Sequence, residues 1–212
     1  RFLIDGEDLD GAQQQVAALF RLAPDNFDGL MLSADIAARR GKMADAHATL
    51  ERAAKRYPKL ADPWIARAKA YDMEGKLDDA IAMTERAVAL APDDRGVIDL
   101  RVQFAAMQGN WEEVRKVLSA QESTLDPVST NGLTYAEAML RTDHPEQARA
   151  MFQRALSRSP NNPYSRLMLA QSQLATGDAA AAYATIRPLS DSILAGPEEL
   201  RLAERASRAL GS

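Results

Sequence analysis

Residues 61–94, ADPWIARAKAYDMEGKLDDAIAMTERAVALAPDD, contain the pattern that decides the fold of the whole chain. The proline near the end of this stretch belongs to a series with a spacing of 34 residues or twice 34: Pro24, Pro58, Pro92 and Pro160. Three more series share this period and phase: Gly41, Gly75, Gly109, Asp143 and Gly177; Ala46, Ala80, Val114, Ala148 and Ala182; Ala34, Ala68, Val102, Ala136 and Ala170. The chain is therefore built from internal repeats.

The composition favours helices within each repeat. Alanine, leucine, arginine and glutamate dominate the 212 residues, and no β-branched run alternates with period two. The small residues of the two alanine-rich series allow two helices to approach closely, while the glycine series suits the end of a first helix. The Pro-Asp-Asn, Pro-Asp-Asp and Pro-Asn-Asn segments end a second helix and offer caps to the next one.

These residues resemble the tetratricopeptide repeat, a 34-residue helix–turn–helix unit. The match is best in residues 61–94, through Trp64, Ala68, Tyr71, Gly75, Ala80, Ala87 and Pro92. The resemblance implies an all-α fold, a right-handed α-α superhelix of antiparallel helix hairpins. It divides the chain into the second half of a preceding repeat (1–26), five units (27–60, 61–94, 95–128, 129–162 and 163–196) and a C-terminal capping helix (197–212). Glu204 replaces a small residue in that last helix, as expected where no further helix packs.

Two regions depart from the pattern. Unit 95–128 has Val102, Val114 and Gln121 where small residues are usual, and its proline is displaced to Pro127, so we expect its helices to lie further apart. Pro188 falls inside the second helix of the last unit and should kink or break it. At the turn of unit 129–162, Asp143 and Glu146 have the spacing of a capping box.

The sequence offers little for catalysis or for metal or cofactor binding. It has no cysteine, no phosphate-binding glycine loop and no nucleophile or metalloprotease motif. His47 and His144 are expected to be solvated residues at helix ends, and pairs such as Asp78–Asp79 suit helix N-termini. Trp64 and Trp111 are expected to pack rather than to stack on a ligand. We therefore predict no enzyme activity, no cofactor and no metal.

The resemblance also implies a binding surface, because the first helices of such units line the concave face of the superhelix. The residues at groove positions are Asp28, Met31, Asp35, Arg39, Asp62, Ile65, Lys69, Asp72, Met73, Asp99, Gln103, Met107, Leu133, Glu137, Leu140, Arg141, Tyr164, Leu167 and Gln171. Acids concentrate in the first three units and apolar residues toward the C-terminal end. This distribution suits an amphipathic protein segment or peptide with some basic residues.

The predicted function is a protein–protein interaction scaffold within a larger bacterial protein. The alternative is a structural module in an envelope or export complex, which stacks end to end through its repeat ends or serves as a spacer. Met31, Asp35, Gly96 and Leu100 occupy positions where chaperone adaptors of this family bind a terminal carboxylate, so no carboxylate clamp is expected. A net charge of −4 argues against nucleic acid, and no apolar stretch is long enough for membrane insertion. The compartment is left open, with family analogy favouring the bacterial envelope or periplasm over the cytoplasm.

Overall fold

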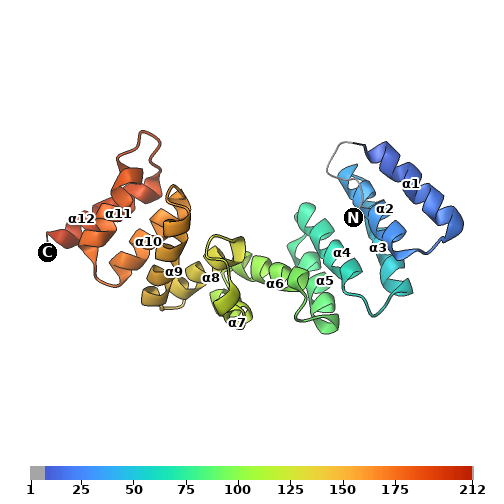
Figure 1. Cartoon of the computed structure of the whole chain (residues 1–212), viewed down its shortest axis with the longest axis horizontal. Helices are drawn as coiled ribbons and strands as arrows, with labels where there is room; N and C mark the ends of the chain where they lie inside the picture. Colours follow the sequence, from blue (N-terminus) through green and yellow to red (C-terminus); the bar gives the residue numbers. More distant parts are fainter. Residues whose placement is uncertain (1–7, 212) are drawn as a thin grey trace. The chain divides into compact units, whose positions relative to one another are not determined.

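The computed structural model describes residues 8–211, and all regular structure in this range is helical (Figure 1). The described residues form two compact units, which divide between Phe104 and Ala105. The N-terminal unit holds α1 (Leu9–Leu22), α2 (Phe27–Arg39), α3 (Met43–Arg56), α4 (Asp62–Met73), α5 (Leu77–Leu90) and most of α6 (Arg95–Met107). The C-terminal unit holds α7 (Trp111–Ser119), the 3-10 helix η1 (Glu122–Thr124), α8 (Thr130–Arg141), α9 (Pro145–Arg158), α10 (Pro163–Ala175), α11 (Ala179–Ser190) and α12 (Pro197–Leu210).

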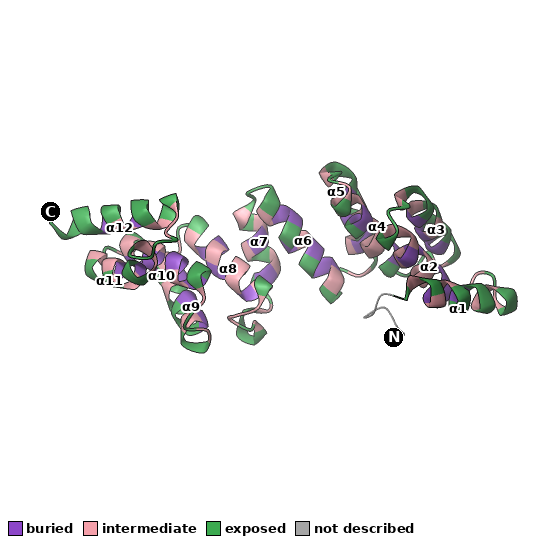
Figure 2. Cartoon of the chain, turned by 90° about the horizontal axis from the view of Figure 1, so that it is seen from above, coloured by how far each residue is buried: buried purple, intermediate pink, exposed green. Residues whose placement is uncertain are grey.

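Within each unit the helices pack in chain order as antiparallel hairpins. In the N-terminal unit α2 packs on α3 and α4 on α5, and α3 also contacts α4. In the C-terminal unit each helix from α7 to α12 packs on the next one, and α10 also contacts α8 and α12. The buried residues therefore line the helix sides that meet, while the outer surfaces are exposed (Figure 2). This arrangement confirms the predicted all-α hairpin fold.

Small residues occupy the closest contacts between helices, as the repeat predicts. Ala68 and Ala80 are fully buried with Leu100 and Phe104 in one core cluster of the N-terminal unit. A second cluster there joins Ala61, Ala87 and Val97. In the C-terminal unit Ala170 is buried among Leu167, Ile186 and Leu202. A larger side chain at these alanines would push the two backbones apart.

The turn between the two helices of a hairpin requires one residue in the left-handed region. Gly41, Gly75, Gly109 and Gly177 have φ between 71° and 82°. Asp143 takes the same conformation, with φ 64°. The expected capping box at Asp143 is therefore wrong: the N-cap of α9 is His144, and no side chain caps that helix. The Pro-Asp/Asn segments do supply caps, since Asn26 and Asn162 accept from the N–H groups of Gly29 and Ser165.

The two irregular regions depart from the regular repeat in different ways. Pro188 does not break its helix, because α11 continues to Ser190. Relative to the 34-residue repeat, however, α11 ends two residues earlier than α3, α5 and α9 do. Pro188 lacks the N–H that would bond the Ala184 carbonyl, so only one hydrogen bond near the end of the helix is lost. In the other region α7 has 9 residues where α5 has 14, and η1 follows it.

The last helix, α12, has a charged residue where the full repeats have a small one. Glu204 is exposed, as expected, and pairs with Arg208 one turn later. Within residues 8–211, no helix has both the length and the apolar character that a bilayer span requires.

Candidate functional site

The residues predicted to bind a partner all lie on the first helices of the hairpins: α2, α4, α6, α8 and α10. They fall on two surfaces, one in each compact unit. The N-terminal face comprises Asp28, Met31, Asp35, Arg39, Asp62, Ile65, Lys69, Asp72, Met73, Asp99 and Gln103. The C-terminal face comprises Leu133, Glu137, Leu140, Arg141, Tyr164, Leu167 and Gln171. Met107, at the end of α6, is 57% exposed and falls in the C-terminal unit.

The N-terminal face combines carboxylates with an exposed methionine. Asp28, Asp62 and Asp99 are exposed, and the Met73 side chain is 68% exposed. Asp35 pairs with Arg39 one turn along α2, with 3.0 Å between Oδ2 and Nε. The Gln103 amide of α6 donates to Asp72 of α4 at 2.8 Å, so neighbouring first helices are joined at this surface.

Ile65 belongs to the packing beneath the N-terminal face more than to the face itself. It is half-buried and contacts both core clusters of α4, α5 and α6. Its side chain is accordingly held in place by the fold, and only part of it is accessible to a partner.

A side-chain network organises the C-terminal face. The Tyr164 hydroxyl of α10 donates to Glu137 of α8 at 2.6 Å, and Arg141 pairs with the same carboxylate at 3.1 Å. The Arg141 guanidinium also lies 5.8 Å from the centroid of the Trp111 ring. Burial, together with the neighbouring Glu137 carboxylate, raises the pKa of Tyr164 well above its usual value, which keeps this hydroxyl a hydrogen-bond donor.

The structure corrects one of the predicted binding residues. Leu167 is only 8% exposed and packs with Ala170, Ile186 and Leu202, so it is part of the core and cannot serve as a surface contact. The helical period shows which residues share a face of the helix. A residue at the edge of that face can turn either into the core or toward solvent, and the sequence alone did not decide this for Leu167. Gln171, one turn further, does reach the surface and donates to Glu198 of α12 at 3.0 Å.

The two histidines do not form a site together, but His47 is not the solvated residue that was expected. Its Nε2 lies 2.7 Å from Glu74, and its ring stacks on Tyr71 with 4.0 Å between centroids. The hydrogen bonds from His47 and Lys76 hold the pKa of Glu74 below its usual value. This cluster joins α3 to the turn after α4 and so contributes to packing. His144 contacts the Thr142 carbonyl at 2.6 Å.

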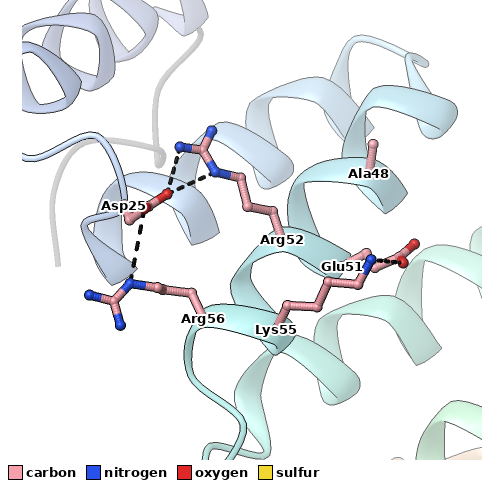
Figure 3. A pocket seen from close by; sticks show the side chains of 6 residues that line it. All are labelled: Asp25, Ala48, Glu51, Arg52, Lys55 and Arg56. Carbon is pink, nitrogen blue, oxygen red and sulfur yellow. Dashed lines mark hydrogen bonds and ion pairs between the residues drawn. The ribbon is translucent and has the colours of Figure 1, made fainter.

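A shallow, open hollow lies along the second helix α3, away from the predicted faces (Figure 3). Its basic side chains are already paired: Arg52 binds Asp25 at 2.6 Å and Lys55 binds Glu51 at 2.7 Å. Arg52 also donates to the Pro24 carbonyl, so these groups attach the connection before α2 to α3. Among the described residues, no three His, Asp or Glu side chains gather as a possible metal site.

Comparison with known proteins identifies the repeat. A tetratricopeptide repeat model matches residues 37–103 and 139–193, and a second model of the same repeat matches residues 3–61. Neither match includes residues 104–138, the segment around α7 and η1. Among curated protein sequences, no relative matches significantly.

Solved structures of low sequence identity share the fold. Pseudomonas aeruginosa PilF is 20% identical over 97% of this chain and 87% of its own, with a TM-score of 0.64. YrrB, described as having an unusual peptide-binding site, is 8% identical over 92% of this chain and 96% of its own, with a TM-score of 0.69. PilW, described as a type IV pilus biogenesis factor, is 17% identical over 94% of this chain and 92% of its own, with a TM-score of 0.62. With family models matching more than half of its residues, the chain belongs to the tetratricopeptide repeat family.

Proposed function

We propose that the chain is a non-catalytic adaptor that binds a peptide or helix of a partner protein on its first-helix faces. The observation that carries the proposal is the N-terminal face, where Met73 is 68% exposed on the same set of first helices as the exposed carboxylates of Asp28, Asp62 and Asp99. A flexible apolar side chain adapts to the apolar side of a bound segment. The carboxylates attract basic residues of that segment and accelerate its association.

The C-terminal face supports the same function in a different way. Tyr164, Glu137 and Arg141 hold one another through hydrogen bonds, so these side chains are ordered before a partner arrives. Binding to ordered side chains loses less conformational entropy. The half-buried Leu133 and Leu140 offer apolar contact between the polar groups.

The setting is proposed from relatives of similar fold. YrrB carries a peptide-binding site and PilW acts in type IV pilus biogenesis, according to their descriptions. We infer that the partner of this chain is a component of a bacterial envelope or export assembly.

The test compares two double variants with the wild-type protein. Asp62→Lys with Met73→Glu changes the first helix α4, while the control, Asp78→Lys with Leu90→Glu, makes the same chemical changes at exposed positions of the second helix α5. Circular dichroism establishes that both are folded. Proteins from the native lysate are then captured on each and quantified by mass spectrometry.

The expected result is a partner that is captured by the wild type and by the α5 control but lost by the α4 variant. Equal capture by all three proteins would contradict binding on the N-terminal face. Light scattering over a range of concentrations provides a second measurement. A constant monomer mass agrees with an adaptor, whereas a mass that grows with concentration would support the alternative of self-assembly.

A further inference from the structure

The connection between α11 and α12, residues 191–196, differs from the equivalent connections in other repeats. The connections after α1, α3, α5 and α9 contain a proline followed by polar or charged residues in most cases, such as Pro92-Asp93-Asp94. The connection after α11 reads Asp-Ser-Ile-Leu-Ala-Gly. Figure 1 shows it as a long loop at one end of this helix pair. Its two large aliphatic residues, Ile193 and Leu194, are 100% and 87% exposed.

The exposure of this pair follows from the position of Pro188. In the repeat phase Leu194 occupies the place of Pro58 and Pro92, so the proline of this unit comes six residues early. Helix α11 then ends at Ser190 and leaves a longer connection. At the place of Ile193, Tyr57 packs on Phe27 with 5.1 Å between ring centroids. The aliphatic side chain of Ile193 makes no such contact and extends into solvent.

Hydrogen bonds within the connection fix its shape. The Ser192 N–H donates to the Leu189 carbonyl at 3.2 Å, and the Ala195 N–H donates to the Ser192 carbonyl at 3.0 Å. The Ser192 hydroxyl accepts from the Leu194 N–H at 3.2 Å. Arg187 pairs with Asp191 at 3.0 Å at the start of the turn. A turn normally carries polar residues, so an aliphatic pair held outward by these bonds contributes nothing to the core of this unit.

We propose that Ile193 and Leu194 are an apolar anchor that inserts into an apolar pocket of a partner protein whose rim is basic. The segment 187–199 contains three acidic residues, Asp191, Glu198 and Glu199, and one basic residue, Arg187. Since Arg187 pairs with Asp191, the net excess is two negative charges. This acidic border complements lysine and arginine around the pocket. The anchor is separate from the first-helix faces and does not depend on the function proposed for them.

The same charges argue against two other occupants. Anionic lipid headgroups repel an acidic border, and two aliphatic side chains provide little area for stable membrane attachment. Two copies of this chain that met at this connection would bring the same carboxylates together. A partner protein of opposite charge is therefore the occupant that the surroundings of the anchor favour.

Site-specific photocrosslinking in cells that produce the full-length protein tests the proposal. A benzophenone amino acid replaces Ile193, and in a matched control it replaces Asn161, which is exposed in the connection between α9 and α10 of the same unit. The expected result is one discrete adduct from position 193 and none from position 161. The crosslinked peptide of the partner should lie in an apolar pocket bordered by lysine or arginine.

Affinity for the purified partner provides the quantitative arm. Ile193→Ser combined with Leu194→Ser should weaken binding by about 100-fold or more, because two aliphatic side chains lose their burial. Leu60→Ser, at a partly exposed leucine in the connection after α3, should leave it unchanged. Asp191→Lys combined with Glu199→Lys should slow association by about tenfold at low salt.

Several outcomes would overturn the proposal. They are an adduct with the mass of a phospholipid, an adduct of two copies of this chain, equal adducts from positions 161 and 193, or no adduct at all. A crosslinked peptide outside a basic-rimmed pocket, or an unchanged affinity of the double serine variant, would overturn it as well. None of these results depends on the variants of α4 that test the first-helix faces.

Discussion

The connections after α5 and after α7 occupy equivalent places in the repeat but are built differently. After α5, Ala87 is fully buried against Ala61 and Val97, and Asp94 caps α6 by accepting from the Gly96 N–H at 2.8 Å. After α7, the place of Ala87 is taken by Gln121. A long polar side chain does not fit a contact made for alanine, and α7 ends at Ser119, before that place is reached.

The irregular connection is compensated at the helix that follows it. Gly132 of α8 stands where α2 and α6 have the buried Leu30 and Ile98. A Cβ atom at Gly132 would lie 2.1 Å from the Asp126 carbonyl oxygen, so the connection occupies the space of the missing side chain. The comparison teaches that the irregular connection after α7 and the glycine at position 132 fit each other.

The largest expected effect is that of Gly132→Ala. Its Cβ would meet the backbone of Asp126 and Pro127, which cannot move without displacing the connection, so we expect a loss of about 3 kcal/mol in unfolding free energy. The matched control is Gly96→Ala in α6, whose Cβ would come no closer than 3.2 Å to a side-chain atom of Asp94. It should stay within about 1 kcal/mol of the wild type. Urea denaturation measures both, and equal stabilities would refute the proposed compensation.

The next effect comes from exchanging the residues of the two connections. Ala87→Gln places a polar chain in a fully buried contact and should cost about 2 kcal/mol. Gln121→Ala, in the half-buried irregular connection, should change the stability by less than about 0.5 kcal/mol. The two variants are compared by urea denaturation followed by circular dichroism. A similar cost for both would mean that the two connections are equivalent after all.

A smaller effect is expected where the irregular connection is attached to α8. The buried Tyr135 donates its hydroxyl to Glu122 of η1 at 3.2 Å, and Tyr135→Phe should cost about 1 kcal/mol at pH 8. Burial and the Glu122 carboxylate raise the pKa of Tyr135 from 10.0 to about 12. Folding thus favours the protonated phenol, and this contribution is complete below pH 10 and is lost as the pH rises through 12.

The pH dependence separates this hydrogen bond from simple packing. The advantage of the wild type over Tyr135→Phe should shrink, or reverse, when unfolding free energies at pH 8 and pH 11 are compared. A difference that stays constant between these two pH values would mean that folding does not raise the pKa of Tyr135.

The smallest effect concerns the ion pairs that attach the connections to the next second helix. Arg158 binds Asp126 at 2.6 Å in the irregular case, and Arg52 binds Asp25 at 2.6 Å in a regular one. Both pairs are about half exposed, so Arg158→Ala and Arg52→Ala should each cost about 0.5 kcal/mol. In 1 M sodium chloride, which screens surface charges, the cost of Arg158→Ala should vanish, whereas part of the cost of Arg52→Ala should remain because Arg52 also donates to the Pro24 carbonyl. A salt-independent loss would point to packing of the arginine stems instead.

Much of the fold could be predicted from the sequence because the same residue pattern recurs in several units. Gly75 and Ala80, for example, are supported by equivalents in other units, and each has the conformation or burial that the repeat requires. The end of α7 and the continuation of α11 through Pro188 have no such support, since each occurs once. The sequence predicted which helices carry the candidate faces. It missed the burial of Leu167 and the packing of His47 against Tyr71, because both depend on neighbouring helices.

The sequence by itself determined the repeat, its helices and the small residues at their contacts. The period of 34 residues is visible along the chain, and the conformational preferences of alanine, glycine and proline are local. Only the tertiary structure decided how single departures are accommodated. Gly132 makes room for the Asp126 carbonyl, and Pro188 is followed by an exposed Ile193 and Leu194. The physical reason is that such adjustments depend on which backbone or side chain occupies the adjoining space, and that neighbour is brought there by the packing of other helices.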